Sequence, residues 1–179
     1  MVAGPTQKST GITNSDASPR VANTAGNGAP GFLNQVDGYV TPAASDGAGT
    51  KYLMARVPSN AVVKEVWLES EAQSAGKVNV GVYYADTALD LAGGSQNSGV
   101  VISSGFFSVD VNLASAVQPT NVTYNGGSYT IDKRSQPLWQ AVGLSSDPGG
   151  KLDIVYTVHT TDITTGTGKL YCAVHYVKP

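Results

Sequence analysis

The sequence predicts an all-β fold, an antiparallel β-sandwich of about eight strands that follows an extended N-terminal arm. Three observations predict it. Charged residues make up only 13% of the 179-residue chain, whereas glycine is frequent, with 21 residues; this composition favours short strands and turns over helices. Apolar residues alternate with a period of two in several short segments. Turn-forming residues separate these segments at short spacing, a pattern typical of sandwiches, with a jelly roll as one candidate topology.

The N-terminal arm comprises residues 1–35, which are rich in Gly, Ala, Ser, Thr, Asn and Pro. These residues carry too little apolar area to offset the entropy of ordering by themselves. Two interpretations remain open: a disordered tail, or an arm that becomes ordered on a partner such as a neighbouring copy. In the second case the apolar pair Phe32 and Leu33 is the expected anchor.

Residues 36–179 are expected to form the sandwich domain. Its predicted strands share apolar or alternating patterns that end at Gly, Pro, Asn or Ser. They cover residues 51–57, 61–71, 77–85, 100–113, 137–144, 151–159 and 168–178, with a weaker hairpin over residues 122–131.

The clearest strand pattern lies in residues 77–85. Val78, Val80 and Val82 are expected to face the core, because alternate side chains of a strand point to opposite faces. Asn79 and Tyr83 should then point outward.

Two further predictions concern which side chains share a strand face and which strands pair. Residues 100–113 should place Phe107 and Val109 on one face. Residues 151–159 and 168–178 are joined by a Thr- and Gly-rich loop and could pair as a hairpin around it.

Charge and hydropathy exclude several classes of function. The net charge is −2, so the chain has no overall basic footprint and nucleic-acid binding is not expected. No apolar run approaches the ~20 residues of a membrane helix, and no signal peptide is evident, so we expect a soluble protein that is made in a cytoplasm. The single cysteine, Cys172, lies in an apolar run and is expected to be a small buried side chain.

No pattern of polar residues predicts a catalytic, cofactor or metal site, so the chain is not expected to be an enzyme. His159 and His175 would lie too far apart on neighbouring strands to share a metal ion. Glu65 and Glu69 share a strand face that is best explained as solvated. Asp86, with a second aspartate four residues later, could hold calcium, but the EF-hand spacing is absent.

Aromatic residues give a hint of an interaction surface. Trp67 should share a face with Glu65, and Trp139 should share a strand face with Ala141, both opposite the main apolar stripe. Exposed aromatic side chains on a sandwich are typical of protein contacts or of sugar-binding platforms. Covering loops, or a reversed assignment of the faces, are the alternatives.

The middle of the chain resembles a known class of proteins. Residues 49–68 contain a strand, then Arg56-Val57-Pro58, then a second strand, and Gly81-Val82-Tyr83 lies in a third. Together with the low-complexity N-terminus, this arrangement over residues 45–85 resembles the decoration (cement) proteins and other small structural proteins of tailed-phage heads.

The resemblance implies a non-enzymatic virion protein on the exterior of the capsid, which bridges capsomers and stabilises the shell. It implies the major capsid protein and other copies of the chain, as a dimer or trimer, as partners. A carbohydrate- or receptor-binding module of a tail fibre or spike is the alternative, and an enzyme that cleaves glycosides is a third and weaker one. The candidate interface residues are Phe32, Leu33, Arg56, Trp67 and Trp139, with Arg56 expected to pair with a partner's carboxylate.

Overall fold

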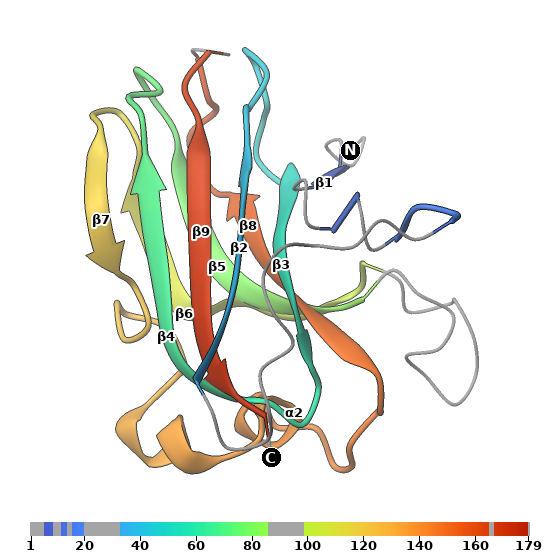
Figure 1. Ribbon diagram of the computed structural model, residues 1–179. Coiled ribbons are helices and arrows are strands. Elements are labelled where there is room, and N and C mark those ends of the chain that lie inside the picture. The colour runs from blue at the N-terminus through green and yellow to red at the C-terminus, as the bar shows by residue number, and fades with distance from the viewer. Residues whose placement is uncertain are drawn as a thin grey trace.

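The fold is a sandwich of two sheets (Figure 1), seen in a computed structural model that describes residues 6–8, 12–13, 16–19, 33–85, 99–164 and 167–178. The five-stranded sheet has the order β1-β3-β8-β5-β6 and the four-stranded sheet the order β2-β9-β4-β7. The strands of the first sheet are β1 (Thr6–Lys8), β3 (Lys51–Pro58), β8 (Lys151–Val158), β5 (Lys77–Tyr84) and β6 (Val101–Asn112). Those of the second are β2 (Leu33–Val40), β9 (Leu170–Val177), β4 (Val62–Ser70) and β7 (Val117–Asn121).

The pairing of the strands is nested. β2 pairs with β9, β3 with β8, β4 with β7 and β5 with β6, all antiparallel, so the chain is one long hairpin rolled into two layers. This is the topology of a jelly roll. The predicted antiparallel β-sandwich is therefore confirmed, and β1 is an additional strand that pairs parallel to β3.

Three predictions about individual elements are wrong. Residues 137–144 contain no strand but the short helix α2 (Leu138–Ala141), which follows the 3-10 helix η2 (Ile131–Ser135). The predicted hairpin over residues 122–131 is absent. Gly126 of this segment forms an isolated antiparallel β-bridge with Ser108 instead. β8 and β9 do not form a hairpin, because each lies inside a different sheet.

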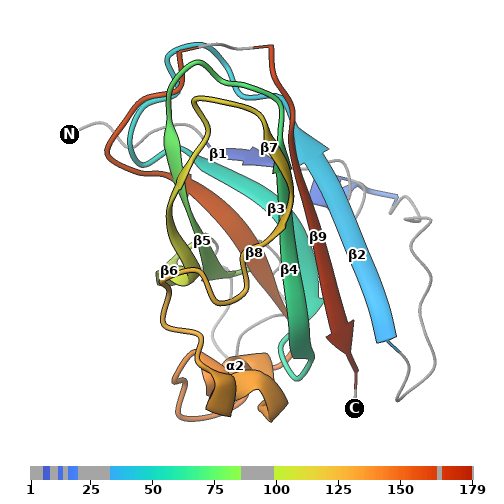
Figure 2. The same cartoon turned by 90° about the vertical axis from the view of Figure 1, so that its left-hand side faces the viewer.

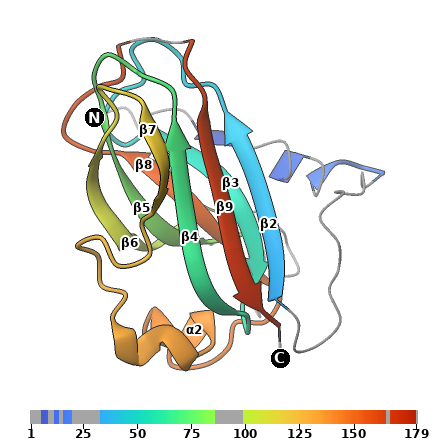
Figure 3. The ribbon, with the colours of Figure 1, turned by 60° about the vertical axis from the view of Figure 1, so that its left-hand side comes forward.

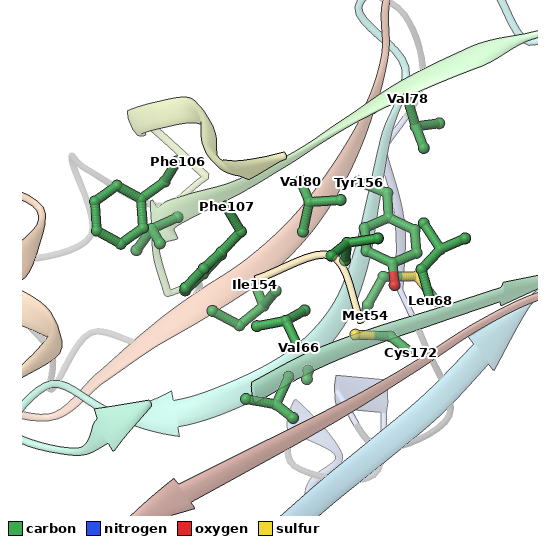
Figure 4. Packing of buried hydrophobic residues seen from close by; sticks show 14 of the residues in the cluster. Met54, Val66, Leu68, Val78, Val80, Phe106, Phe107, Ile154, Tyr156 and Cys172 are labelled. Atoms are coloured by element: carbon green, nitrogen blue, oxygen red, sulfur yellow. The ribbon is translucent and has the colours of Figure 1, made fainter. Parts of the chain in front are cut away.

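The core lies between the two sheets (Figure 4). Val66, Leu68 and Cys172 of the four-stranded sheet pack toward Met54 and Tyr156 of the five-stranded sheet, and all of them are fully buried. Burial of each such side chain contributes about 1.5–3 kcal/mol. The prediction that Cys172 is a small buried side chain is confirmed.

The helix α2 closes one end of the sandwich (Figure 2). The backbone N–H of Leu138 donates to the carbonyl of Ala61, 2.8 Å away. The side chains of Leu138 and Ala141 are buried against the core. An end of a sandwich exposes apolar core residues unless a segment covers it, and α2 supplies that cover.

The outer side of β5 differs from the prediction. Val78, Val80 and Val82 face the core as expected, but Asn79 and Tyr83 are also buried. Their surroundings explain the difference: Asn79 accepts a hydrogen bond from a backbone N–H of β6, and Tyr83 is covered by an N-terminal residue.

An irregularity in β6 turns the side chain of Val109 away from the face on which it was predicted to lie with Phe107. Phe107 is buried, whereas Val109 is exposed. Between the partners Val78–Val111 and Val80–Ser108, β6 has an extra residue, and Asp110 has a positive φ of 56°. Such a bulge turns the local side chains away from the strict alternation.

Candidate functional site

The described histidines lie in separate pairs with carboxylates and not in a metal-binding cluster. Within the described residues, no group of three or more His, Cys, Asp or Glu side chains could hold a metal ion. His159 contacts Asp110 at 2.6 Å, and His175 contacts Glu65 at 3.0 Å, each in a separate surface pair. In the same part of the chain, no helix is long and apolar enough to cross a membrane. The predicted loop pair that begins at Asp86 lies outside the described residues.

Part of the outer face of the five-stranded sheet, over β3, β8 and β5, is in contact with the N-terminal segment, by which we mean residues 6–8, 12–13 and 16–19. β1 runs parallel to β3, with Gln7 opposite Tyr52. The side-chain amide of Gln7 donates to Asp46, 3.0 Å away, and the hydroxyl of Tyr52 donates to the same oxygen at 2.8 Å. These contacts fix one end of the N-terminal segment to the sheet edge.

Ile12 anchors the segment through apolar contacts. Its side chain is 1% exposed and forms a small cluster with Leu53, Tyr83 and Val155, separate from the main core. Leu53, Tyr83 and Val155 come from three neighbouring strands of the sheet. The cluster explains why Tyr83 is buried although its strand face points away from the core.

Arg56 binds the N-terminal segment through an ion pair with Asp16. Its Nε and one terminal nitrogen contact both carboxylate oxygens of Asp153, at 2.6 and 3.0 Å, and the other nitrogen contacts Asp16 at 2.5 Å. The guanidinium is 3% exposed, and the two-point contact is the strong form of this ion pair. Burial acts to raise the pKa of Asp16, but hydrogen bonds and charges from Lys8 and Arg56 outweigh it and leave that pKa below its usual range.

These contacts change the view of two candidate interface residues. Arg56 was expected to meet a partner's carboxylate, and it is engaged by two carboxylates of its own chain. Leu33 was expected to anchor the arm, but it is the first residue of β2 and is 62% exposed. Phe32 lies outside the described residues. An interface role for Leu33 stays a prediction.

The outer face of the four-stranded sheet is the second candidate surface (Figure 3). β4, β9 and β2 lie side by side there, in register over most of their length. We call this the acidic–aromatic face and define it by the outward side chains of the three strands and of the residues that directly follow β4 and precede β9. Its main members are Asp37, Tyr39, Glu65, Trp67, Glu69, Glu71, Lys169, Tyr171 and His175.

A hydrogen-bonded group lies at the centre of this face. Trp67 Nε1 donates to Glu65 Oε2 at 2.9 Å, and His175 Nδ1 donates to the same oxygen at 3.0 Å. His175 Nε2 lies 3.2 Å from Gln35 Oε1. The hydrogen bonds from Trp67 and then His175 lower the pKa of Glu65, so the carboxylate stays charged at neutral pH. The predicted shared face of Trp67 and Glu65 is confirmed.

A hollow lies at one end of the same face. It measures about 290 Å³ and is lined by Tyr39, Glu69, Glu71, Lys169 and Tyr171. Lys169 Nζ lies 5.5 Å from the centre of the Tyr39 ring, and the backbone N–H of Lys169 donates to Glu71 at 2.8 Å. Burial, followed by the charge of a nearby aspartate, raises the pKa of Tyr171. The hollow therefore combines two aromatic rings with two carboxylates.

Trp139 does not belong to this face. It lies in α2 at the end of the sandwich, where its backbone N–H donates to the carbonyl of Ser59 at 3.1 Å. The prediction that Trp139 and Ala141 share one face of a strand is wrong. The two residues lie in a helical turn, and Ala141 packs into the core. The two tryptophans are thus on different elements and do not form one platform.

Several residues of both surfaces were missed from the sequence. Tyr39 could have been found, because Val36 and Val40 lie at alternate positions in the sequence and place Asp37 and Tyr39 on the opposite strand face. Lys169 and Glu71 lie beyond strand ends and carry no such signal. Ile12 and Asp16 are single residues in a low-complexity stretch, and nothing local marks them as contact residues.

Comparison with known proteins identifies shared architecture and no close relative. No protein-family model matches the chain, and no curated protein matches it. A chain from the capsid of Ralstonia phage GP4 is similar in structure over 97% of this chain and 98% of its own, with a TM-score of 0.55 and 14% sequence identity. A chain from the capsid asymmetric unit of cyanophage Pam1 aligns over 92% of this chain and 97% of its own, with a TM-score of 0.41 and 16% identity. The first of these structures shows that the fold described above also occurs in a phage capsid.

Proposed function

We propose that this protein is a structural component of a phage virion, and that it sits on the exterior of a tailed-phage head as a decoration (cement) protein. The observation that carries the proposal is the likeness to a chain of the Ralstonia phage GP4 capsid, which extends over nearly the whole length of both chains. A match of that extent covers the sandwich and its loops together. A chain of one compact jelly roll suits a protein that is added to a shell in many copies.

The sequence and the surface support the same proposal. Within the residues that the structure describes, no group of three or more His, Cys, Asp or Glu side chains could hold a metal ion, and the two histidines lie in surface pairs. The proposed partners are the major capsid protein and other copies of this chain, arranged as a dimer or trimer. Repetition over a symmetric shell would let a modest single contact hold the protein firmly.

The alternative of a carbohydrate- or receptor-binding module of a tail fibre or spike is less well supported. It depended on Trp67 and Trp139 as a joint aromatic platform. Trp67 is half-buried and bonded to Glu65, and Trp139 lies in α2. We therefore do not favour it.

The proposal is tested by sedimentation of the particles formed with this protein. Intact virions are banded in a density gradient and the fractions are probed for this chain and for the major capsid protein. We expect the two proteins to band together, at a ratio that stays constant on repeated banding. Absence of this chain from the particle fraction would refute the proposal.

A further inference from the structure

We propose that the acidic–aromatic face of β2, β9 and β4 is the docking surface of this protein, and that the partner presents a basic protein surface rich in arginine or lysine. The identity of that partner as the capsid shell rests on the proposed function. The assignment of the face and the charge of its partner rest on the observations that follow.

The two outer faces of the sandwich are not equivalent. The outer face of the five-stranded sheet is occupied by the chain's own N-terminal segment, with Ile12 in its apolar cluster and Asp16 on Arg56. No described segment lies over the outer face of β2, β9 and β4, as Figure 3 shows. Of the two broad sheet faces, the acidic–aromatic face is thus the one left open.

The charge of this face indicates the partner. Four carboxylates, those of Asp37, Glu65, Glu69 and Glu71, belong to it. The ammonium of Lys169 lies near Glu69 and Glu71, and the positive charge of Arg134 acts on Glu65. The whole chain is nearly balanced, with 13 acidic and 11 basic residues. The negative charge is therefore concentrated on this face, and a complementary partner surface carries positive charge.

The aromatic rings indicate the kind of positive group. Tyr39 is 49% exposed and lies opposite Tyr171 across the β2–β9 pair, next to the hollow of about 290 Å³. An aromatic ring attracts a cation placed over its face, and arginine makes this contact most often. The ring of Tyr39 already makes such a contact with Lys169 of the same chain, so a partner's cation would share the hollow with Lys169 or displace it from the ring. Glu69 and Glu71 line the same hollow and can accept the hydrogen bonds of a guanidinium.

The test uses the double variant Glu69→Gln/Glu71→Gln in the full chain. It removes two charges at the hollow and preserves the size of both side chains. The matched control is Asp132→Asn/Asp162→Asn, which removes two charges from exposed positions outside the face. A thermal unfolding curve of each variant verifies that it is folded.

The first readout is cosedimentation with virion shells that lack this protein, over a series of salt concentrations. The expected result is that the wild type and the control bind alike, whereas the double variant binds at least about fivefold more weakly and responds less to salt. Equal binding by wild type and double variant would overturn the docking inference and leave the proposed function standing. Failure of the wild type to bind would count against the proposed function instead.

The second readout does not depend on the shells. A fluorescent hexa-arginine peptide is titrated with each protein, and its anisotropy is recorded at low salt. Binding by the wild type and the control that is weakened in Glu69→Gln/Glu71→Gln and in Tyr39→Ala supports the acidic–aromatic face as a cation-binding surface. No binding of the peptide, or equal binding by all variants, would refute the inference.

Discussion

At the scale of single residues, Arg56 and Asp16 decide where the N-terminal segment lies. Arg56 is buried in the five-stranded sheet, where two of its nitrogens contact the carboxylate of Asp153. Asp16 adds the second carboxylate, and Ile12 fills the apolar cluster beside it. The segment is thus attached at a few points, and each of them can be changed without touching the main core.

Acid should release the N-terminal segment. The folded pKa of Asp16 is lowered, so its charged form is the one that binds. The stabilisation is complete above the ordinary carboxyl range near pH 4 and is lost as the pH falls through the lower folded value. The protection of the backbone amides of residues 6–8 and 16–18 against hydrogen exchange, measured relative to the intrinsic exchange rate at each pH, should therefore fall below about pH 4.

The variant Asp16→Asn provides the control for that experiment. It keeps the shape of the side chain and removes the charge, so the segment should be less protected at neutral pH and its protection should change little with acid. A wild-type segment that is equally protected at pH 3 and pH 7, relative to the intrinsic rate, would contradict this account of the ion pair.

Cys172 should be unreactive in the folded protein. Burial raises the pKa of its thiol to about 12, so the nucleophilic thiolate is nearly absent at pH 8. A thiol reagent such as dithionitrobenzoate should label it only after denaturant unfolds the chain. Rapid labelling of the native protein would show that the space between the sheets is open to solvent.

At the scale of elements, α2 shows how the same apolar residues can fit a strand or a helix. Residues 137–144 form the short apolar run that predicted a strand, with Trp139 and Ala141 at alternate positions. Such a run does not by itself distinguish a strand from a helix. The helical turn is favoured by two contacts with the rest of the chain. The backbone N–H of Leu138 donates to the carbonyl of Ala61, and the turn buries apolar side chains at the end of the sandwich. Such a decision comes from distant parts of the chain and is not visible in the segment itself.

Truncation of the cap should destabilise the whole domain. Leu138→Ala removes a fully buried side chain from the core, and we expect a loss of about 2–4 kcal/mol in the free energy of unfolding. Gln140→Ala, at an exposed position of the same helix, should cost far less. Urea denaturation of both variants measures the difference, and equal midpoints would show that α2 does not support the core.

At the scale of the whole molecule, the sandwich class was predictable and the acidic–aromatic face was not. Period-two alternation is a local property, and it identified strands such as Lys77–Tyr84. The face is made of residues that are far apart in sequence. The side chain of His175 contacts Glu65, which is 110 positions away, and Gln35, which is 140 positions away. Only the nested pairing of the jelly roll brings these strands together, and strand order is not encoded in the local pattern.

The same nested pairing supports the central proposal about function. It gives a compact domain whose two broad faces are different, one covered by the N-terminal segment and one open and acidic. A protein added to the outside of a shell needs one face for the shell and a stable remainder. We propose that the open face serves the first purpose and the closed sandwich the second.

Immunogold labelling of intact virions with an antibody against this chain tests the central proposal most directly. The account predicts gold particles spread over the heads, with no treatment needed to open the capsid. Label confined to tail tips would contradict it and would favour a receptor-binding protein. Absence of label from intact particles would contradict an exterior position on the virion altogether.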